Sequence, residues 1–155
     1  MKAAVLTVSD RVSRGEAEDG SGDLLEELLR GANFEVERRL VADERGEIAT
    51  ALRELAPSAQ VVLTTGGTGL AKRDVTPEAT RDVIEREAPG IAQALRANAL
   101  HKTPYAALSR GTAGVIGDTL VVNLVQPKID SEVQSELLRT NLATVIVIRF
   151  LHEFL

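Results

Sequence analysis

The hydrophobic and polar positions along this chain switch repeatedly between the spacing typical of strands and the spacing typical of helices. Apolar or alternating runs predict strands over residues 2–8, 34–41, 60–65, 106–109 and 119–124. Apolar residues at helical spacing predict helices over residues 23–31, 47–55, 77–87, 91–100 and 129–155. The sequence therefore predicts strands that alternate with helices.

An alternation of this kind is typical of mostly parallel sheets, in which right-handed crossovers place helices on both faces. The expected fold class is α/β, a doubly wound three-layer αβα sandwich. A chain of 155 residues has the length of one domain, so we expect residues 1–155 to form a single domain.

Local signals indicate where some of these elements begin. A polar, glycine-bearing loop is expected over residues 9–22, and Ser21 or Asp23 is suited to cap the helix that follows. Thr76 is a natural N-cap before Pro77, because a proline at the first helical position has no N–H to leave unpaired. We therefore expect one helix to start at each of these two places.

The most informative segment is a glycine-rich loop directly after the third strand-like run. Gly66, Gly67 and Gly69 allow positive φ angles and a close approach of the backbone to a ligand, and they leave successive N–H groups available to an anion. Asp74 follows shortly afterwards, where a carboxylate can hold Mg²⁺ against phosphate oxygens or act as a general base. The loop predicts a phosphate-binding site.

Polar loops follow each of the first three expected strands, at Ser9 and Asp10, at Asp43 and Glu44, and at Gly66. In a doubly wound sheet, ligands bind beyond the carboxyl ends of the strands. We therefore expect these three loops to meet in one crevice.

Composition excludes several classes of function. The net charge of −5 and an aromatic content of 3% disfavour nucleic acid as a partner. With no cysteine and two histidines, the chain is not expected to contain a disulfide, a thiolate nucleophile or a His-rich metal site. The N-terminal apolar run lacks the pattern of a signal peptide, and the most apolar stretch, residues 142–151, is too short to cross a bilayer. We expect a cytoplasmic protein without a membrane partner.

Several short motifs occur in a particular order. They are Thr7-Val8-Ser9-Asp10, Asp19-Gly20-Ser21-Gly22, Thr65-Gly66-Gly67-Thr68-Gly69, Arg73-Asp74-Val75-Thr76-Pro77-Glu78-Ala79-Thr80, Thr103-Pro104 and Leu108-Ser109-Arg110. Together they resemble the molybdopterin adenylyltransferase family of molybdenum-cofactor biosynthesis, over residues 1–124. The resemblance implies a trimeric cytoplasmic enzyme that binds molybdopterin and Mg·ATP and transfers AMP to the molybdopterin phosphate, with release of pyrophosphate.

The resemblance also implies roles for the matching positions. Asp74 resembles the family's catalytic acidic residue and Asp43 a second functional acid, and both are expected to hold Mg²⁺. The residues expected to bind pterin or nucleotide are Ser9, Asp10, Ser21, Gly66, Gly67, Thr68, Gly69, Arg73, Thr76 and Ser109. Ordinary structural explanations remain open, because Asp74 suits a helix start, Asp43 a turn and Ser109 a local hydrogen bond.

The chain departs from the family after residue 124. Where the family has a Pro-Gly-x-Pro turn, this chain has Val125-Gln126-Pro127-Lys128 and lacks a glycine able to adopt positive φ. Residues 129–155 carry more apolar side chains than one buried stripe needs, and their β-branched residues 145–148 also fit a buried strand. We expect this segment to pack on the sheet and to contact another subunit or a protein partner.

Three functions therefore remain open from the sequence. The first is an active molybdopterin adenylyltransferase. The second is a catalytically impaired or engineered family member that acts as a trimeric binding or assembly protein through the apolar C-terminal segment. The third is a related nucleotide-processing domain that binds ATP and ignores molybdopterin.

Overall fold

A computed structural model of the chain describes residues 1–126 and 130–152, with side chains as far as Asn141. Within these residues, six strands form one sheet in the order β2-β1-β3-β6-β5-β4. Their bounds are β1 (Lys2–Val8), β2 (Glu35–Val41), β3 (Val61–Thr65), β4 (Arg86–Glu87), β5 (Ala113–Ile116) and β6 (Thr119–Asn123). β1 pairs in parallel with β2 and β3, β3 pairs in parallel with β6, and β5 is antiparallel to β4 and β6. The prediction of a mostly parallel sheet is confirmed.

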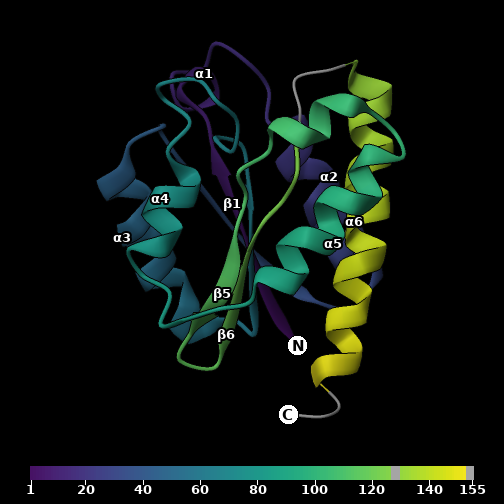
Figure 1. The fold of residues 1–155 in the computed structure, drawn as a ribbon. Helices are drawn as coiled ribbons and strands as arrows, with labels where there is room; N and C mark the ends of the chain where they lie inside the picture. The colour runs from purple at the N-terminus through teal and green to yellow at the C-terminus, as the bar shows by residue number, and fades with distance from the viewer. Residues whose placement is uncertain (127–129, 153–155) are drawn as a thin grey trace.

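Helices cover both faces of this sheet. They are α1 (Asp10–Ser13), α2 (Gly20–Gly31), α3 (Arg45–Leu55), α4 (Thr76–Arg81), α5 (Pro89–Leu100) and α6 (Ser131–His152), with short 3₁₀ turns η1 (Ala56–Ser58) and η2 (Pro104–Leu108). Figure 1 shows α2, α5 and α6 on one side of the sheet and α3 and α4 on the other. The three-layer αβα sandwich is confirmed.

The alternation of side chains along the strands divides the core between the two faces. On β1, Ala3 and Val5 pack with the cluster of α2, α5 and α6, whereas Ala4, Leu6 and Val8 pack with the cluster of α3 and α4. β1 runs from the N-terminus at the bottom of Figure 1 to α1 at the top, so the carboxyl ends of the parallel strands lie at the top. Side chains that follow these strands are therefore held at one edge of a rigid sheet.

The prediction of one continuous loop over residues 9–22 is wrong, because that segment contains α1 and the first turn of α2. Ser9 caps α1 by accepting a hydrogen bond from the Val12 N–H at 3.2 Å. Asp19 caps α2 by accepting one from the Gly22 N–H at 3.1 Å, so neither Ser21 nor Asp23 is the cap. α1 is only four residues long and has one apolar residue, and α2 begins with small polar residues and glycine, so neither helix start is visible in the apolar pattern.

The helix expected to run from Pro77 to residue 87 is shorter than predicted. α4 spans Thr76–Arg81, and the residue before it is Val75, which makes no side-chain capping bond, so Thr76 is not the N-cap. Beyond α4, the backbone pairs with β5 through the hydrogen bond from the Glu85 N–H to Val115 O at 2.8 Å, and it forms β4. Pairing with a distant strand therefore overrides the helical pattern there.

The strand predicted over residues 106–109 is also wrong, since η2 occupies most of this segment. The proline at the start of η2 has a restricted φ, and Thr103 caps the turn by accepting a hydrogen bond from the Tyr105 N–H at 3.3 Å. A strand lies instead at Ala113–Ile116, in a segment that contains Gly111, Gly114 and Gly117.

The C-terminal segment is helical over Ser131–His152, so the alternative strand at residues 145–148 is wrong. Leu137 and Leu138 on α6 are buried in the core that α2 and α5 share. The apolar side chains from residue 142 onward, on which the predicted subunit contact depends, lie outside the described side chains. No helix among the described residues is both long and apolar enough to span a bilayer.

Candidate functional site

The loops after β1 and β2 are joined by two reciprocal hydrogen bonds. The Asp10 N–H donates to Asp43 Oδ2 at 2.7 Å, and the Asp43 N–H donates to Asp10 Oδ1 at 3.0 Å. Next to them, the Ser9 N–H donates to Val41 O at 3.0 Å. This arrangement places Asp43 beside α1 and confirms that these two loops meet.

Arg73 joins the segment after β3 to the same place. Its Nε and Nη2 donate to the two carboxylate oxygens of Asp10 at 2.5 and 3.0 Å, and Nη2 also donates to Glu44 Oε1 at 2.8 Å. The hydrogen bond from Arg73, followed by that from the Asp43 N–H, lowers the pKa of Asp10 below its ordinary value of 3.8. Asp10 and Arg73 thus form an ion pair, which joins the segment after β3 to the loops after β1 and β2.

The converging loops line a cleft of about 990 Å³ at the carboxyl ends of the strands. Of the predicted site residues, those that line it are Ser9, Asp10, Ser21, Asp43, Gly66, Gly67, Thr68, Gly69, Arg73, Asp74 and Ser109. Thr76 does not line it and is buried. The structure thus brings eleven predicted residues into one cavity and places Thr76 behind its wall.

Gly66 and Gly67 both adopt left-handed backbone angles, with φ of +101° and +67°. A side chain on Gly66 would overlap the carbonyl oxygen of Val8, and one on Gly67 would overlap the hydroxyl of Thr76. Only glycine combines this conformation with such close contacts. The sequence signal of this loop therefore reflects a real backbone requirement.

Thr76 holds the start of the glycine loop from behind. Its hydroxyl donates to Gly66 O at 2.9 Å, and its backbone N–H donates to Gly67 O at 3.1 Å. α4 in turn is fixed to the sheet, because Asn123 on β6 donates from Nδ2 to the hydroxyls of Thr64 and Thr80, both at 2.9 Å. Thr76 thus contacts the backbone of the loop and not the cleft.

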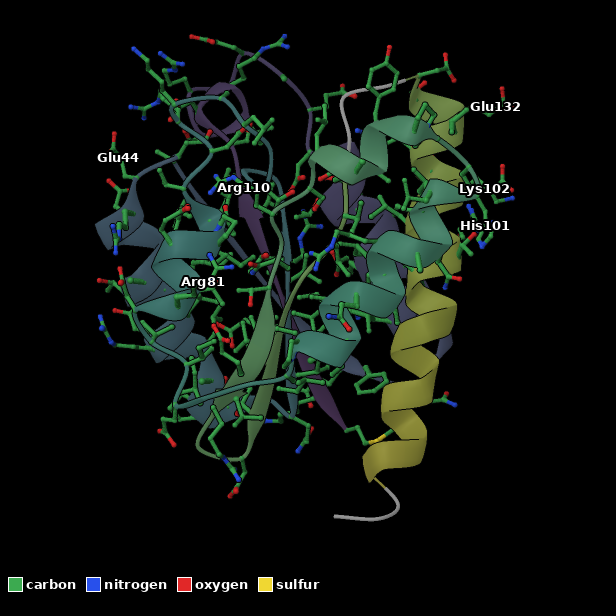
Figure 2. All side chains as sticks on the ribbon, viewed as in Figure 1. Glu44, Arg81, His101, Lys102, Arg110 and Glu132 are labelled. Atoms are coloured by element: carbon green, nitrogen blue, oxygen red, sulfur yellow. The ribbon has the colours of Figure 1, made fainter. Side chains whose placement is uncertain are left out.

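Arg110 holds the rest of the glycine loop, and it was part of the motif Leu108-Ser109-Arg110, where no role was assigned to it. Its backbone N–H donates to Thr68 O at 2.8 Å, and its Nε donates to Gly69 O at 2.7 Å. Its Nη2 donates to Asp74 O at 2.5 Å, and its Nη1 forms an ion pair with Glu78. Figure 2 labels Arg110 in the middle of the molecule, between α4 and the upper ends of the strands. One guanidinium therefore closes the loop that carries Asp74.

These contacts decide where the N–H groups of the loop point. In a trans peptide, the C=O and the following N–H point in opposite directions, and the described chain contains no cis peptide bond. Since Thr76 and Arg110 hold four successive carbonyls on the side away from the cleft, the next N–H groups face it. They belong to Gly67, Thr68, Gly69 and Leu70, and within the described residues none of them donates a hydrogen bond. The loop is a ready-made anion site.

Two carboxylates face this anion site. Partial burial raises the pKa of Asp43 above its ordinary value of 3.8, the N–H of Asp10 partly offsets this, and the charges of Asp10 and Asp74 raise it further. Asp74 accepts a hydrogen bond from the Ala71 N–H at 3.0 Å through one oxygen. Both carboxylates thus contribute negative charge on the side of the cleft where a cation would be favourable.

Neutral polar side chains also line the cleft. The Thr65 hydroxyl at the end of β3 bonds the Ser21 hydroxyl at 3.2 Å and also bonds Gln126 Oε1. Ser109 Oγ accepts a hydrogen bond from the Gly111 N–H at 3.3 Å. Gln126 belongs to the turn that departs from the family pattern, and Pro127 and Lys128 of that turn lie outside the described residues.

Asp19 also lines the cleft, although it was named only as part of the motif Asp19-Gly20-Ser21-Gly22, without a role. Besides capping α2, it accepts a hydrogen bond from the Thr7 hydroxyl at 2.7 Å and pairs with Arg38 from β2. A polar residue directly before a glycine-bearing helix start was the signal that could have identified it. Lys72, the cationic residue before Arg73, is exposed and does not line the cleft.

The ion pair between Glu78 and Arg110 predicts a specific dependence of stability on pH. Burial acts to raise the pKa of Glu78, but the hydrogen bond and charge of Arg110 outweigh it, so the pKa lies below 4.5. A carboxyl group whose pKa is lowered by folding stabilises the folded state when the pH is above its ordinary pKa. That stabilisation is lost as the pH falls through the lower pKa of the folded state. We expect Glu78→Gln to be less stable than the unmodified chain at neutral pH, with the difference narrowing below pH 4.5. Urea unfolding at a series of pH values measures this, and a constant difference would contradict it.

Comparison with known proteins shows which family has a similar sequence. The sequence profile described as "Probable molybdopterin binding domain" matches residues 4–127, most of the chain. The molybdopterin adenylyltransferase of Escherichia coli K12 is 43% identical over 134 residues, which cover 83% of this chain and 69% of that protein. The molybdenum cofactor synthesis protein cinnamon of Drosophila melanogaster is 44% identical over 124 residues, 77% of this chain, but this stretch is only 21% of that longer protein.

A solved structure agrees with the sequence comparison. The molybdopterin biosynthesis enzyme MoaB of Thermus thermophilus superposes with a TM-score of 0.81 at 44% identity. The superposition covers 95% of this chain and 90% of that one. The similarity thus extends beyond the segment that the family profile matches.

Proposed function

The chain belongs to the molybdopterin-binding domain family, and we propose that it is a molybdopterin adenylyltransferase, which transfers AMP from ATP to the phosphate of molybdopterin and releases pyrophosphate. The observation that carries this proposal is the row of unpaired N–H groups facing two carboxylates in one cleft. Relatives at 43% identity that bear this activity in their names support it.

The reaction leaves the protein little covalent chemistry to perform. An oxygen of the molybdopterin phosphate forms a bond to the α-phosphorus of ATP, the bond from that phosphorus to the bridging oxygen breaks, and its electron pair leaves with pyrophosphate. Because both reactants are anions, alignment and charge neutralisation are the main demands. The N–H groups of residues 67–70 supply fixed positive dipoles for the phosphates without needing to reorganise.

Asp43 and Asp74 are suited to hold Mg²⁺ with the substrate phosphates, since Mg²⁺ takes oxygen ligands and needs only one or two carboxylates from the protein. In the part of the chain that the structure describes, this cleft included, no group of three or more His, Cys, Asp or Glu side chains is placed to hold a metal ion. Bound at Asp43 and Asp74, Mg²⁺ would neutralise phosphate charge. Asp10 and Arg73 act in this proposal by fixing the position of Asp43.

The proposal includes further expectations that come from the family resemblance. Ser9, Ser21 and Ser109 would hydrogen-bond polar groups of the pterin or nucleotide, and Thr76 would act by holding the glycine loop. The active form would be a homotrimer in the cytoplasm. The relatives named as adenylyltransferases favour this function over the assembly protein and over a domain with another substrate.

The direct test is pyrophosphate release by the purified chain. We expect release only when ATP, molybdopterin and Mg²⁺ are all present, and none when any one of them is omitted. Release that is independent of molybdopterin would favour the nucleotide-processing alternative. No release by a correctly folded chain would favour the assembly protein and direct attention to the turn at residues 125–128.

A further inference from the structure

Several exposed apolar side chains line the cleft. The large apolar residues exposed in the described chain are Met1, Leu40, Leu70, Leu100, Tyr105 and Leu108. Three of them line the cleft: Leu70 is 67% exposed, Tyr105 58% and Leu108 49%. We call these three residues the apolar rim. A cluster of exposed apolar residues at a cleft indicates a surface that a ligand covers.

The residues of the apolar rim belong to two backbone segments, η2 and the end of the glycine loop, which are hydrogen-bonded to each other through Arg110. In a 3₁₀ turn, side chains three residues apart lie on the same side, so Tyr105 and Leu108 of η2 share one face. Leu70 directly follows Gly69, whose carbonyl is bonded by Arg110 two residues after Leu108. The rim therefore continues directly from the anion site of the glycine loop.

The chemistry of the rim differs from that of the opposite side of the cleft. Asp10, Asp43 and Arg73 are bonded around the loops after β1 and β2 on that opposite side. Asp74 is a charged lining residue close to the rim along the chain, and it is bonded to the Ala71 N–H. The residues that line the cleft beside η2 and at the start of α6, Ser109 and Ser131, are neutral. Tyr105 is the only aromatic residue in the described lining and the only tyrosine in the chain. A flat, uncharged ring suits the rim better than a phosphate does.

We propose that Tyr105, with Leu70 and Leu108, forms the surface on which a fused nitrogen heterocycle of a substrate stacks while its phosphate binds the N–H groups of the glycine loop. This inference rests on the proposed function, whose two substrates both join such a ring to phosphate: adenine in ATP and the pterin in molybdopterin. An aromatic face under a planar heterocycle strengthens binding about tenfold or more.

The chain offers an internal probe for the adenine arm of the test. Because it contains one tyrosine and no tryptophan, its tyrosine emission comes from Tyr105 alone. If adenine stacks there, titration with ATP quenches this emission. Isothermal titration calorimetry with ATP and, separately, with molybdopterin then identifies the ring, because Tyr105→Ala weakens binding of the stacked substrate about tenfold while Tyr105→Phe keeps it within about twofold.

A matched pair of leucines supplies the control. Leu108 and Leu100 are both 49% exposed, but only Leu108 lines the cleft. Leu108→Ala is expected to weaken binding of the same substrate, and Leu100→Ala is expected to leave both affinities unchanged.

Other outcomes overturn the inference. If Tyr105→Ala binds ATP and molybdopterin as tightly as the unmodified chain, the rim does not stack on a ring. If Tyr105→Ala changes the oligomeric state measured by light scattering, the rim is a subunit contact instead. If the unmodified chain binds neither substrate, the proposed function itself fails, and this result is distinct from a failure confined to the rim.

Discussion

Replacing Asp74 with asparagine is expected to lower the rate of pyrophosphate release at least about a hundredfold while leaving the fold intact, a loss typical of removing one electrostatic group from a catalytic site. Asparagine has the shape of aspartate, and its amide oxygen can still accept the hydrogen bond that the Ala71 N–H donates to Asp74 at 3.0 Å. What disappears is the negative charge beside the anion site. The rate is measured at saturating ATP, molybdopterin and Mg²⁺, together with a thermal unfolding curve.

The control for this substitution is Asp82→Asn. Asp82 follows α4 and pairs with Arg45 at 2.6 Å, outside the cleft. Its neutral variant is expected to retain the full rate of release. Equal losses in both variants, or full activity in Asp74→Asn, would show that the charge of Asp74 does not serve the reaction.

Replacing Arg110 with glutamine is expected to lower kcat/KM for ATP by about ten- to a hundredfold, because several charge-assisted hydrogen bonds are lost together. Arg110 bonds Gly69 O at 2.7 Å and Asp74 O at 2.5 Å through one rigid fork, and it also pairs with Glu78. A glutamine amide cannot reach all three partners. The Gly69 carbonyl then becomes free to turn toward the cleft, where it repels phosphate.

A matched variant separates loss of positioning from general loss of stability. Arg96 also donates to a loop carbonyl, Gly111 O at 2.8 Å, but it does not contact the glycine loop or line the cleft. Arg96→Gln is expected to lower the melting temperature somewhat and to leave affinity for inorganic pyrophosphate unchanged, whereas Arg110→Gln is expected to weaken that affinity. Unchanged pyrophosphate binding in Arg110→Gln would mean that the loop holds its shape without the guanidinium.

The glycine loop shows why part of the site was predictable. Gly66 and Gly67 must be glycine for local reasons, a positive φ and a neighbouring backbone or side-chain atom that leaves no room for Cβ. Local requirements of this kind appear directly in the sequence. Asp74 was identified for a similar reason, since it lies close to that loop along the chain.

Arg110 and Tyr105 show why the rest was not predictable. Arg110 acts through carbonyls 41 and 36 residues away, those of Gly69 and Asp74, and nothing in its immediate sequence indicates such partners. Tyr105 lies directly before a segment predicted to be a strand, where its neighbours would have alternated between two faces instead of placing Leu108 on the same face as Tyr105. An error in one short element therefore concealed a candidate contact with substrate.

The sequence by itself determined the layered α/β fold, because the spacing of hydrophobic residues along the chain is a local property. It also determined the glycine loop and the carboxylates beside it, because the need for glycine and the order of the motifs can be read directly from the chain. Only the tertiary structure decided that β4 interrupts a helical pattern and that Thr76 lies behind the glycine loop. Only the tertiary structure also decided that Arg110 helps to turn the N–H groups of the glycine loop toward the cleft. Each of these depends on hydrogen bonds between residues far apart in sequence. The energy of such bonds is set by geometry that exists only after the sheet has formed.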